Sequence, residues 1–456
     1  MKSSQNAKSS VQIVVDIDEI DYHGKGIALS TTPITIVEDA LQGERLKVRL
    51  THQSKQVQFA TPVKIEKASL KRVEPFCPHY DECGGCSMQS MSASNGIAMK
   101  TRALKRLMQT KFGLEDEVFM PSVLADIDYE TSLEQRRGYR RKVRIAIDAR
   151  NHNKVRLGYK QQHSNQVVDI RSCKILVPEL EISVLSLLAS LRASEDGELS
   201  TESAPKAILK KLGHIDAASL KTGVVVHINA SKPLFSNELD YFQQLAQALK
   251  LRIQVSEKGH KKADYCAENA LLAIEDIAGL SLGVAINDFF QINGPVNRKM
   301  INQALEWLAP DSKAIVHDFY CGIGNFSLAL AKHCGQVIAY EGVSEMTVRG
   351  KENAEQNELN NCQFTCLNLS DEKALSSLKL KRDDLVLLDP ARDGAKALCE
   401  KLSAEKVKRI VYVSCNPSTL IRDLSILATR YKIKKMSTLD MFAFTQHLET
   451  MVLLES

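Results

Sequence analysis

The sequence lacks any uncharged apolar run long enough to cross a lipid bilayer. Its start, MKSSQNAKSS, also lacks the apolar segment of a secretory signal. We find no internal repeats and no low-complexity segments. These absences argue against a membrane-spanning or exported protein, and we expect a cytoplasmic one.

A large excess of charge is missing as well. The formal net charge of +5 is too small to indicate a polyanionic partner by itself, so the distribution of charge matters more. The composition, 44% hydrophobic and 25% charged, is that of a globular protein. A chain of 456 residues exceeds one ordinary hydrophobic core, which predicts two or three domains.

Disulfide bonds are not expected either, although the chain has eleven cysteines, because the cytosol keeps thiols reduced. Cys77, Cys83 and Cys86 lie close together in a glycine-containing stretch, and Cys415 ends an apolar run. For most of the other cysteines, packing in a core is the default interpretation.

The pattern of apolar residues divides the chain. Residues 11–66 alternate apolar and polar positions between Gly and Pro, which predicts a small all-β barrel. Residues 94–113 have helical periodicity and end at Gly113, a suitable C-cap. From about residue 286, strands, turns and helices alternate, which is typical of a parallel sheet with helices on both faces.

We therefore predict a multidomain protein of three parts. These are an N-terminal β-barrel, a central α+β domain and a C-terminal doubly wound, Rossmann-like α/β domain, at residues 1–69, 70–285 and 286–456.

The C-terminal part carries the signs of a nucleotide-like cofactor. A strand runs into the glycine turn CGIGN, but Ser327 stands where a dinucleotide fingerprint has its third glycine. The next strand ends at Glu341, placed to accept hydrogen bonds from ribose hydroxyls, and a third ends at Asp389-Pro390. Each acid alone is explained as a helix cap, but all three features together favour S-adenosylmethionine over a nicotinamide cofactor.

Cys415, in VSCNPSTLIRD, suggests which reaction this domain performs. Carbon 5 of a pyrimidine is too weak a nucleophile to take a methyl group unaided, but a thiolate that adds to carbon 6 activates it. Such an enzyme needs a cysteine and a base that later removes the carbon-5 proton. Glu449, just before the last apolar strand, is the candidate base. The alternative is that Cys415 is an inert buried thiol.

The stretches LLDPARDGA, VSCNPSTLIRD and FTQHLETMVLLE resemble the RNA uracil-5-methyltransferase family. GKGIAL and EDALQGERLKV resemble its TRAM domain, an RNA-binding module, and PFCPHYDECGGCSMQ resembles its iron–sulfur segment. The combination resembles members acting on 23S ribosomal RNA, which implies methylation of carbon 5 of a uridine there, uridine 1939. The alternatives are another 23S uridine, transfer RNA, or a non-catalytic RNA-binding or redox-sensing protein. We expect a monomer.

The resemblance implies a role for several residues. It places the nucleophile at Cys415 and the base at Glu449. The implied contacts to S-adenosylmethionine are Gln291, Tyr320, Asn325, Glu341, Asn368 and Asp389. Tyr320 stands where relatives often have Phe, and either ring can stack.

The clustered cysteines provide three soft ligands, Cys77, Cys83 and Cys86, which suit zinc or an iron–sulfur cluster. The resemblance implies Cys173 as the fourth ligand, although Lys174 follows it where Pro is usual. We favour a [4Fe-4S] cluster over zinc, because structural zinc sites usually pair their cysteines two and two.

Residues 136–160 contain ten Lys or Arg and a single acid, Asp148, with Tyr139 and Tyr159 between them. A basic stretch is often only a solvated face. With acids so depleted, an RNA backbone is the better interpretation. Because the target uracil must leave its stack, single-stranded or unfolded RNA is favoured.

Overall fold

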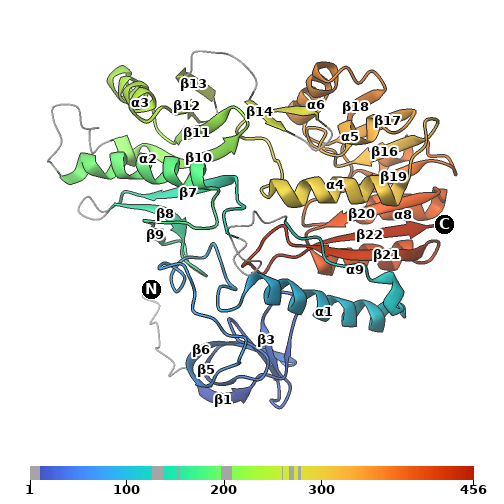
Figure 1. The fold of residues 1–456 in the computed structure, drawn as a ribbon, viewed down its shortest axis with the longest axis horizontal. Helices are drawn as coiled ribbons and strands as arrows, with labels where there is room; N and C mark the ends of the chain where they lie inside the picture. Colours follow the sequence, from blue (N-terminus) through green and yellow to red (C-terminus); the bar gives the residue numbers. More distant parts are fainter. Residues whose placement is uncertain are drawn as a thin grey trace, which may run out of the picture.

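The computed structural model describes residues 11–125, 137–150, 155–196, 208–258, 260–265, 272–275 and 279–456. In Figure 1, an N-terminal sheet lies at the bottom, a central sheet at the left and a C-terminal sheet at the right. The predicted multidomain α/β protein is therefore confirmed. Among the helices described, none combines the length and the apolar character that crossing a membrane requires.

The N-terminal part is all-β, as expected. Its strands are β1 (Gln12–Asp16), β2 (Glu19–Ile20), β3 (Gly26–Ala28), β4 (Ile34–Val37), β5 (Arg45–Gln53) and β6 (Val57–Lys67). They form one six-stranded sheet in the order β1-β5-β6-β4-β3-β2. In β5, Leu46 and Val48 are buried while Arg45 and Lys47 are exposed, because successive side chains of a strand point to opposite faces.

The central part is built on a seven-stranded sheet in the order β13-β12-β11-β10-β7-β8-β9. Its elements are β7 (Lys142–Asp148), β8 (Arg156–Lys160), β9 (Val167–Asp169), α2 (Pro178–Asp196), η3 (Ile208–Lys210), β10 (Leu212–Leu220), β11 (Gly223–Ala230), α3 (Ser236–Leu249), β12 (Arg252–Glu257) and β13 (His260–Tyr265). Helices α2 and α3 cover one face, where Leu188 and Phe242 share a core with Val143 and Ile145 of β7. Arg144 points to the other face.

The C-terminal sheet has the order β18-β17-β16-β19-β20-β22-β21. Its first five strands are parallel, and β22 runs antiparallel to both neighbours. The strands are β16 (Ile315–Phe319), β17 (Gln336–Glu341), β18 (Cys362–Cys366), β19 (Leu385–Leu388), β20 (Arg409–Ser414), β21 (Lys432–Leu439) and β22 (Glu449–Glu455). The helices are α4 (Gly294–Leu308), α5 (Ser327–Ala331), α6 (Ser344–Gln356), α7 (Glu372–Ser376), α8 (Lys396–Glu405) and α9 (Pro417–Leu427).

Both faces of this sheet are covered. Val411 and Val413 of β20 belong to one core, with residues of α4, α5 and α6. Ile410 and Tyr412 of the same strand belong to another core, with residues of α8 and α9. The strands are therefore buried on both sides, which explains why they read as continuous apolar runs.

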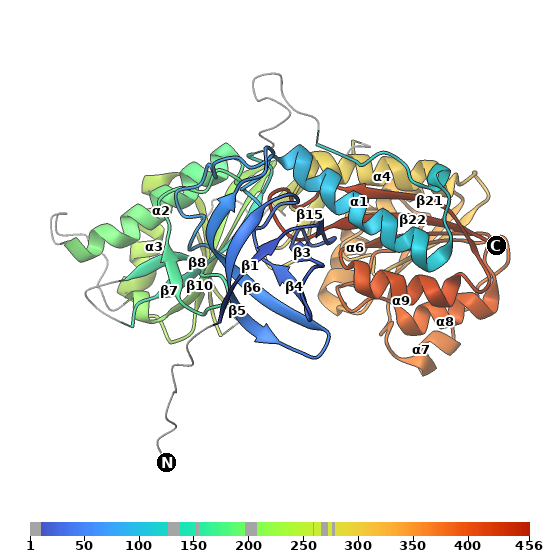
Figure 2. The ribbon, with the colours of Figure 1, turned by 90° about the horizontal axis from the view of Figure 1, so that it is seen from below.

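Helix α1 (Ala93–Phe112) and strand β15 (Ser281–Val284), both from the expected central segment, pack against the C-terminal sheet instead. Helix α1 matches the predicted helix and ends at Gly113, whose φ of 64° is left-handed. Its Leu104 and Met108 pack into the core that α8 and α9 also line, and Figure 2 shows α1 lying along this sheet. The short strands β14 (Leu272–Glu275) and β15 (Ser281–Val284) pair with each other, and β15 packs in the opposite core.

A short 3-10 helix, η1 (Asp116–Val118), follows α1. The chain after it runs beside β21, where Met120 and Val123 donate backbone hydrogen bonds to Met436 and Thr438. The segment before the central sheet thus continues the packing that α1 begins.

Candidate active site

Most of the predicted site residues lie at one edge of the C-terminal sheet. Tyr320 follows β16, Glu341 ends β17, Asp389 follows β19 and Cys415 follows β20. Because these strands are parallel and neighbouring, their carboxyl ends meet at the same edge. Asn368, two residues after β18, is at this edge too.

Cys415 and Glu449 come together through strand pairing. In the antiparallel pair of β20 and β22, Ser414 lies opposite Thr450. When this pairing is continued by one residue, Cys415 comes to lie beside Glu449, the first residue of β22. The two residues are 34 positions apart in the sequence, and the strand pairing brings them to one place.

The helix that follows Cys415 holds it in position. The Asn416 side chain caps α9 by accepting a hydrogen bond from the Ser418 N–H, and Pro417 occupies the first turn. The Asn416 Nδ2 also donates to the Arg392 carbonyl at 3.0 Å. Cys415 is half-buried between a strand end and a capped helix.

Two carboxyls change the electrostatics around the thiol. Burial raises the pKa of Glu449 well above its usual value, and Asp389 raises it further. Burial raises the pKa of Asp389 to about 7. It also raises the pKa of the Cys415 thiol to about 11, with smaller contributions from Glu449 and Asp389 that Arg392 opposes. The free site therefore holds a protonated thiol beside carboxyls that accept protons readily.

The glycine turn is tied to Glu341. The Glu341 carboxylate accepts hydrogen bonds from the backbone N–H groups of Gly322, at 3.1 Å, and Val343, at 2.9 Å. Gly322 has a φ of 58°, in the left-handed region that glycine adopts without strain. The acid thus fixes the turn and keeps acceptor capacity for a ligand hydroxyl.

The other predicted cofactor residues have different surroundings. Asn325 exchanges two hydrogen bonds with Asn297 of α4, at 2.8 and 3.0 Å. Tyr320 is half-buried with a left-handed φ of 65°, and burial raises its pKa. The exposed Asn368 caps a turn by accepting from the Ser370 N–H.

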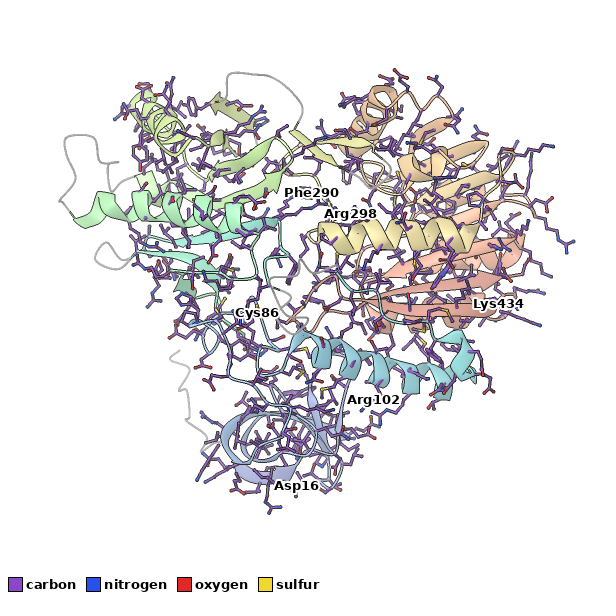
Figure 3. The ribbon with its side chains drawn as sticks, viewed as in Figure 1. Asp16, Cys86, Arg102, Phe290, Arg298 and Lys434 are labelled. Carbon is purple, nitrogen blue, oxygen red and sulfur yellow. The ribbon has the colours of Figure 1, made fainter. Side chains whose placement is uncertain are left out.

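Gln291 connects the central and C-terminal parts. Its side chain is buried. Its backbone carbonyl accepts a hydrogen bond from the Arg141 Nε at 2.8 Å. The Arg141 N–H donates to the Ile292 carbonyl. Figure 3 shows the neighbouring Phe290 between the central sheet and α4.

One residue of this edge was missed from the sequence. Asp318 of β16 is fully buried; its Oδ2 accepts from the Ser327 hydroxyl at 2.5 Å, and its Oδ1 has no hydrogen-bond partner within the described parts of the chain. Burial raises its pKa to about 7. An acid in the apolar strand AIVHDFY, just before the glycine turn, was the available signal.

The four cysteines predicted as metal ligands, Cys77, Cys83, Cys86 and Cys173, all line one cavity of about 170 Å³. Figure 3 shows Cys86 between the central and N-terminal sheets. No three His, Cys, Asp or Glu side chains within the described ranges are grouped closely enough to hold a single metal ion. The buried Tyr159 hydroxyl, at the same cavity, has no hydrogen-bond partner among the residues described.

The predicted basic strip is not one surface. Arg136 and Lys154 lie outside the described residues. Arg140 lines the cysteine cavity, while Arg141 holds the Gln291 backbone. Arg144, Arg150 and Lys160 of the strip line an open groove of about 870 Å³ on the central sheet. The start of β10 and residues on either side of that strand line the same groove. The basic side chains that line it are Arg144, Arg150, Lys160, Lys210, His214 and Lys232, and the one acid in its lining is Asp148.

Comparison with known proteins identifies the family. Residues 203–456 match the family described as tRNA (Uracil-5-)-methyltransferase. A protein of Alteromonas mediterranea, named 23S rRNA (uracil(1939)-C(5))-methyltransferase RlmD, is 34% identical over 99% of this chain and 89% of its own. A protein of Vibrio parahaemolyticus with the same name is 33% identical over 97% of this chain and 95% of its own.

A solved structure shares the fold. It is the tRNA (uracil-54, C5)-methyltransferase of Pyrococcus abyssi in complex with S-adenosyl-L-homocysteine. Its TM-score is 0.71 at 20% identity, over 97% of this chain and all of that one. The resemblance seen in the sequence motifs is confirmed, and the chain belongs to the tRNA (Uracil-5-)-methyltransferase family.

Proposed function

We propose that this enzyme transfers a methyl group from S-adenosylmethionine to carbon 5 of a uridine in 23S ribosomal RNA, uridine 1939, and forms 5-methyluridine. The observation that carries the proposal is the placement of Cys415 beside Glu449 at the cofactor edge of the sheet. The 23S substrate is supported by full-length relatives with that activity in their names.

Cys415 and Glu449 divide the chemistry between them. Cys415 first releases its thiol proton to solvent, and the thiolate adds to carbon 6 of uracil. Carbon 5 of the resulting enolate then takes the methyl group, and S-adenosylhomocysteine is left. Glu449 then removes the proton from carbon 5, the carbon 5–carbon 6 double bond re-forms, and the bond from carbon 6 to Cys415 breaks. Because its pKa is raised, the Glu449 carboxylate is a stronger base than an ordinary one.

The cofactor supplies the methyl group, and the sheet edge supplies its contacts. We assign Glu341 to the ribose hydroxyls, and Asn325 and Asp389 to polar groups nearby. The other proposed contacts to S-adenosylmethionine are Gln291, Tyr320 and Asn368. Asp318 fits the same role as the other acids, since its Oδ1 is a buried acceptor with no partner among the described residues.

A [4Fe-4S] cluster fits the cysteine cavity better than zinc does. Zinc draws its ligands onto one point, whereas a four-iron cluster takes one thiolate on each of four irons. Cys77, Cys83, Cys86 and Cys173 surround a common cavity without converging on one ion. When bound, the cluster would join the cysteine-rich segment to the central sheet.

Metal analysis tests this assignment. Protein purified without oxygen should contain iron and acid-labile sulfide, and replacement of any one of the four cysteines by Ser should reduce both. Cys366→Ser, at an exposed cysteine, should retain them. Stoichiometric zinc without iron would decide for the alternative.

RNA binding is assigned to the N-terminal sheet, as a TRAM-like barrel, and to the groove on the central sheet. Five Lys or Arg line the groove against one acid, Asp148. Within the groove, Arg144 pairs with Asp216 and Arg150 with Asp148. The excess of positive over negative side chains along the groove suits phosphates.

The decisive experiment uses RNA that carries 5-fluorouridine at the target position. Fluorine at carbon 5 cannot leave as a proton, so the enzyme should remain covalently bound to methylated RNA in a denaturation-resistant complex. RNA with fluorine at a neighbouring uridine is the control and should give none. If no complex forms with 23S fragments but one forms with transfer RNA, the substrate assignment is wrong.

A further inference from the structure

Residues 440–448 connect β21 to β22 and end directly at Glu449. Any movement of this connection would therefore move the proposed base. Most of its anchoring contacts come from outside its own sheet, from the cysteine-rich segment, α1 and the start of the central domain. One of them involves Lys100, a residue that the mechanism above does not use.

Lys100 of α1 is buried at 2% exposure. Its Nζ donates hydrogen bonds to the carbonyl oxygens of Thr445, at 2.9 Å, and His447, at 2.8 Å. These carbonyls lie four and two residues before Glu449. A single ammonium group therefore bridges the last turn of the connection from a helix that precedes it by more than three hundred residues in sequence.

A buried lysine is costly, because its charge loses hydration. Burial lowers the pKa of Lys100 to about 8, and Asp440 acts in the opposite direction. Neutral side chains can also donate to carbonyl groups, so a lysine is not required for satisfying them. A charged donor forms stronger hydrogen bonds than a neutral one, which suits a connection that must not move.

The connection is held elsewhere too. The Phe444 carbonyl accepts hydrogen bonds from the N–H groups of Ser87 and Met88, both at 3.0 Å. The Tyr139 hydroxyl donates to the Ala443 carbonyl at 3.0 Å. Phe444 itself has a φ of 63°, a strained value for a residue with a side chain. Surrounding contacts must maintain such a conformation, and Lys100 acts on the stretch between it and Glu449.

We propose that Lys100 is a positioning residue for the final proton removal: through the Thr445 and His447 carbonyls it holds the end of the 440–448 connection so that Glu449 faces carbon 5 of the uracil bound to Cys415. The inference rests on the proposed function, since it takes Glu449 as the base. It makes a residue of α1 a positioning residue for a reaction that takes place at the edge of the C-terminal sheet.

The test compares Lys100→Met with Lys105→Met in the full-length protein. Met fills a similar volume without an ammonium group, and Lys105 lies on the same helix but pairs with Asp116 at the surface. With unmodified RNA and labelled S-adenosylmethionine, Lys100→Met should accumulate a denaturation-resistant adduct that carries the methyl label. Its breakdown should be slowed about ten- to hundredfold, the effect of a small misplacement of a reacting group. Lys105→Met should resemble the wild type.

Glu449→Gln, run in parallel, separates the two proposals. If Glu449→Gln traps the adduct and Lys100→Met turns over normally, the positioning role is wrong and the proposed function stands. If Glu449→Gln traps nothing, the base assignment is wrong, and the inference about Lys100 falls with it. Binding of S-adenosylhomocysteine by Lys100→Met should be unchanged, and a loss of that binding together with activity would mean a general structural role, which overturns the proposal.

Lys100→Gln is the second variant if Lys100→Met does not fold. Its amide nitrogen is one bond closer to the backbone than the lysine nitrogen and carries no charge, so it should hold the two carbonyls more weakly. Adduct should accumulate with a shorter lifetime than in Glu449→Gln. Turnover by Lys100→Gln at the wild-type rate, without adduct, would overturn the proposal.

Discussion

Ser414 pairs with Thr450 across β20 and β22, and the two strands run in opposite directions. The end of β20 and the start of β22 therefore meet at one edge of the sheet. A parallel β22 would have brought its last residue, not Glu449, to Cys415. The antiparallel strand thus places the proposed base, Glu449, beside the proposed nucleophile, Cys415, which follows a parallel strand.

Cys415→Ala should reduce methyl transfer by at least about a thousandfold, because carbon 5 is not activated without the thiolate. Binding of S-adenosylhomocysteine should be unchanged, since the thiol attacks the uracil. Cys366→Ala, at an exposed cysteine, is the matched control and should be fully active. Turnover by Cys415→Ala would contradict the mechanism.

Glu449→Gln should stop the reaction after methyl transfer, because an amide does not accept the carbon-5 proton. The enzyme should stay bound to methylated RNA through Cys415, as a labelled band on a denaturing gel. Normal turnover would make Glu449 a structural carboxyl. Inactivity without adduct would mean that it acts before methyl transfer, or that another group such as Asp440 is the base.

Glu341→Gln should weaken S-adenosylmethionine binding by about ten- to hundredfold, the value of one hydrogen bond to a charged group. The carboxylate also accepts from the Gly322 and Val343 N–H groups, so the glycine turn should loosen at the same time. Calorimetry measures the affinity. Glu345→Gln, at an exposed position of α6, should bind normally.

Asp389→Asn should change how stability depends on pH. The pKa of Asp389 is raised to about 7 in the folded protein, so the folded state holds a proton that the unfolded state loses near pH 4. The stability that this proton provides is present below about pH 4 and is lost as pH rises to about 7. We compare the free energy of unfolding of the variant with that of the wild type, measured in urea. The difference, variant minus wild type, should be higher at pH 8 than at pH 4 by at least about 1 kcal/mol. An equal difference at both pH values would contradict the raised pKa.

RNA binding should depend on the groove of the central sheet. Replacing Lys210 and Lys232 by Gln should reduce the slope of log affinity against log salt by about 1 to 2, since each phosphate contact on a single strand contributes about 0.7. Filter binding at several salt concentrations measures the slope. Lys373→Gln with Lys379→Gln, exposed positions of the C-terminal part, should leave it unchanged. Arg141 is a poorer choice, because it supports the Gln291 backbone.

Local sequence patterns predicted the elements well. Helix α1 begins and ends within one residue of the expected positions, since a left-handed glycine ends it. The strand ends that carry Glu341, Asp389 and Cys415 were visible because a buried parallel strand is a short apolar run that stops at a polar residue. The ends of helices and of buried strands depend on residues that are close together in the sequence, so local patterns predict them.

The tertiary structure decided which of these residues meet. The order and direction of β20, β21 and β22 placed Glu449 beside Cys415, and strand pairing is a property of residues far apart in sequence. In the same way, only the structure shows that the basic strip has several roles: Arg140 lines the cysteine cavity, Arg144 lines both that cavity and the groove, and Arg141 holds the Gln291 backbone. In the sequence, Lys100 is one of several cations in the predicted helix at residues 94–113. Only the packing of α1 against the C-terminal sheet shows that its charge is buried on the backbone that precedes Glu449.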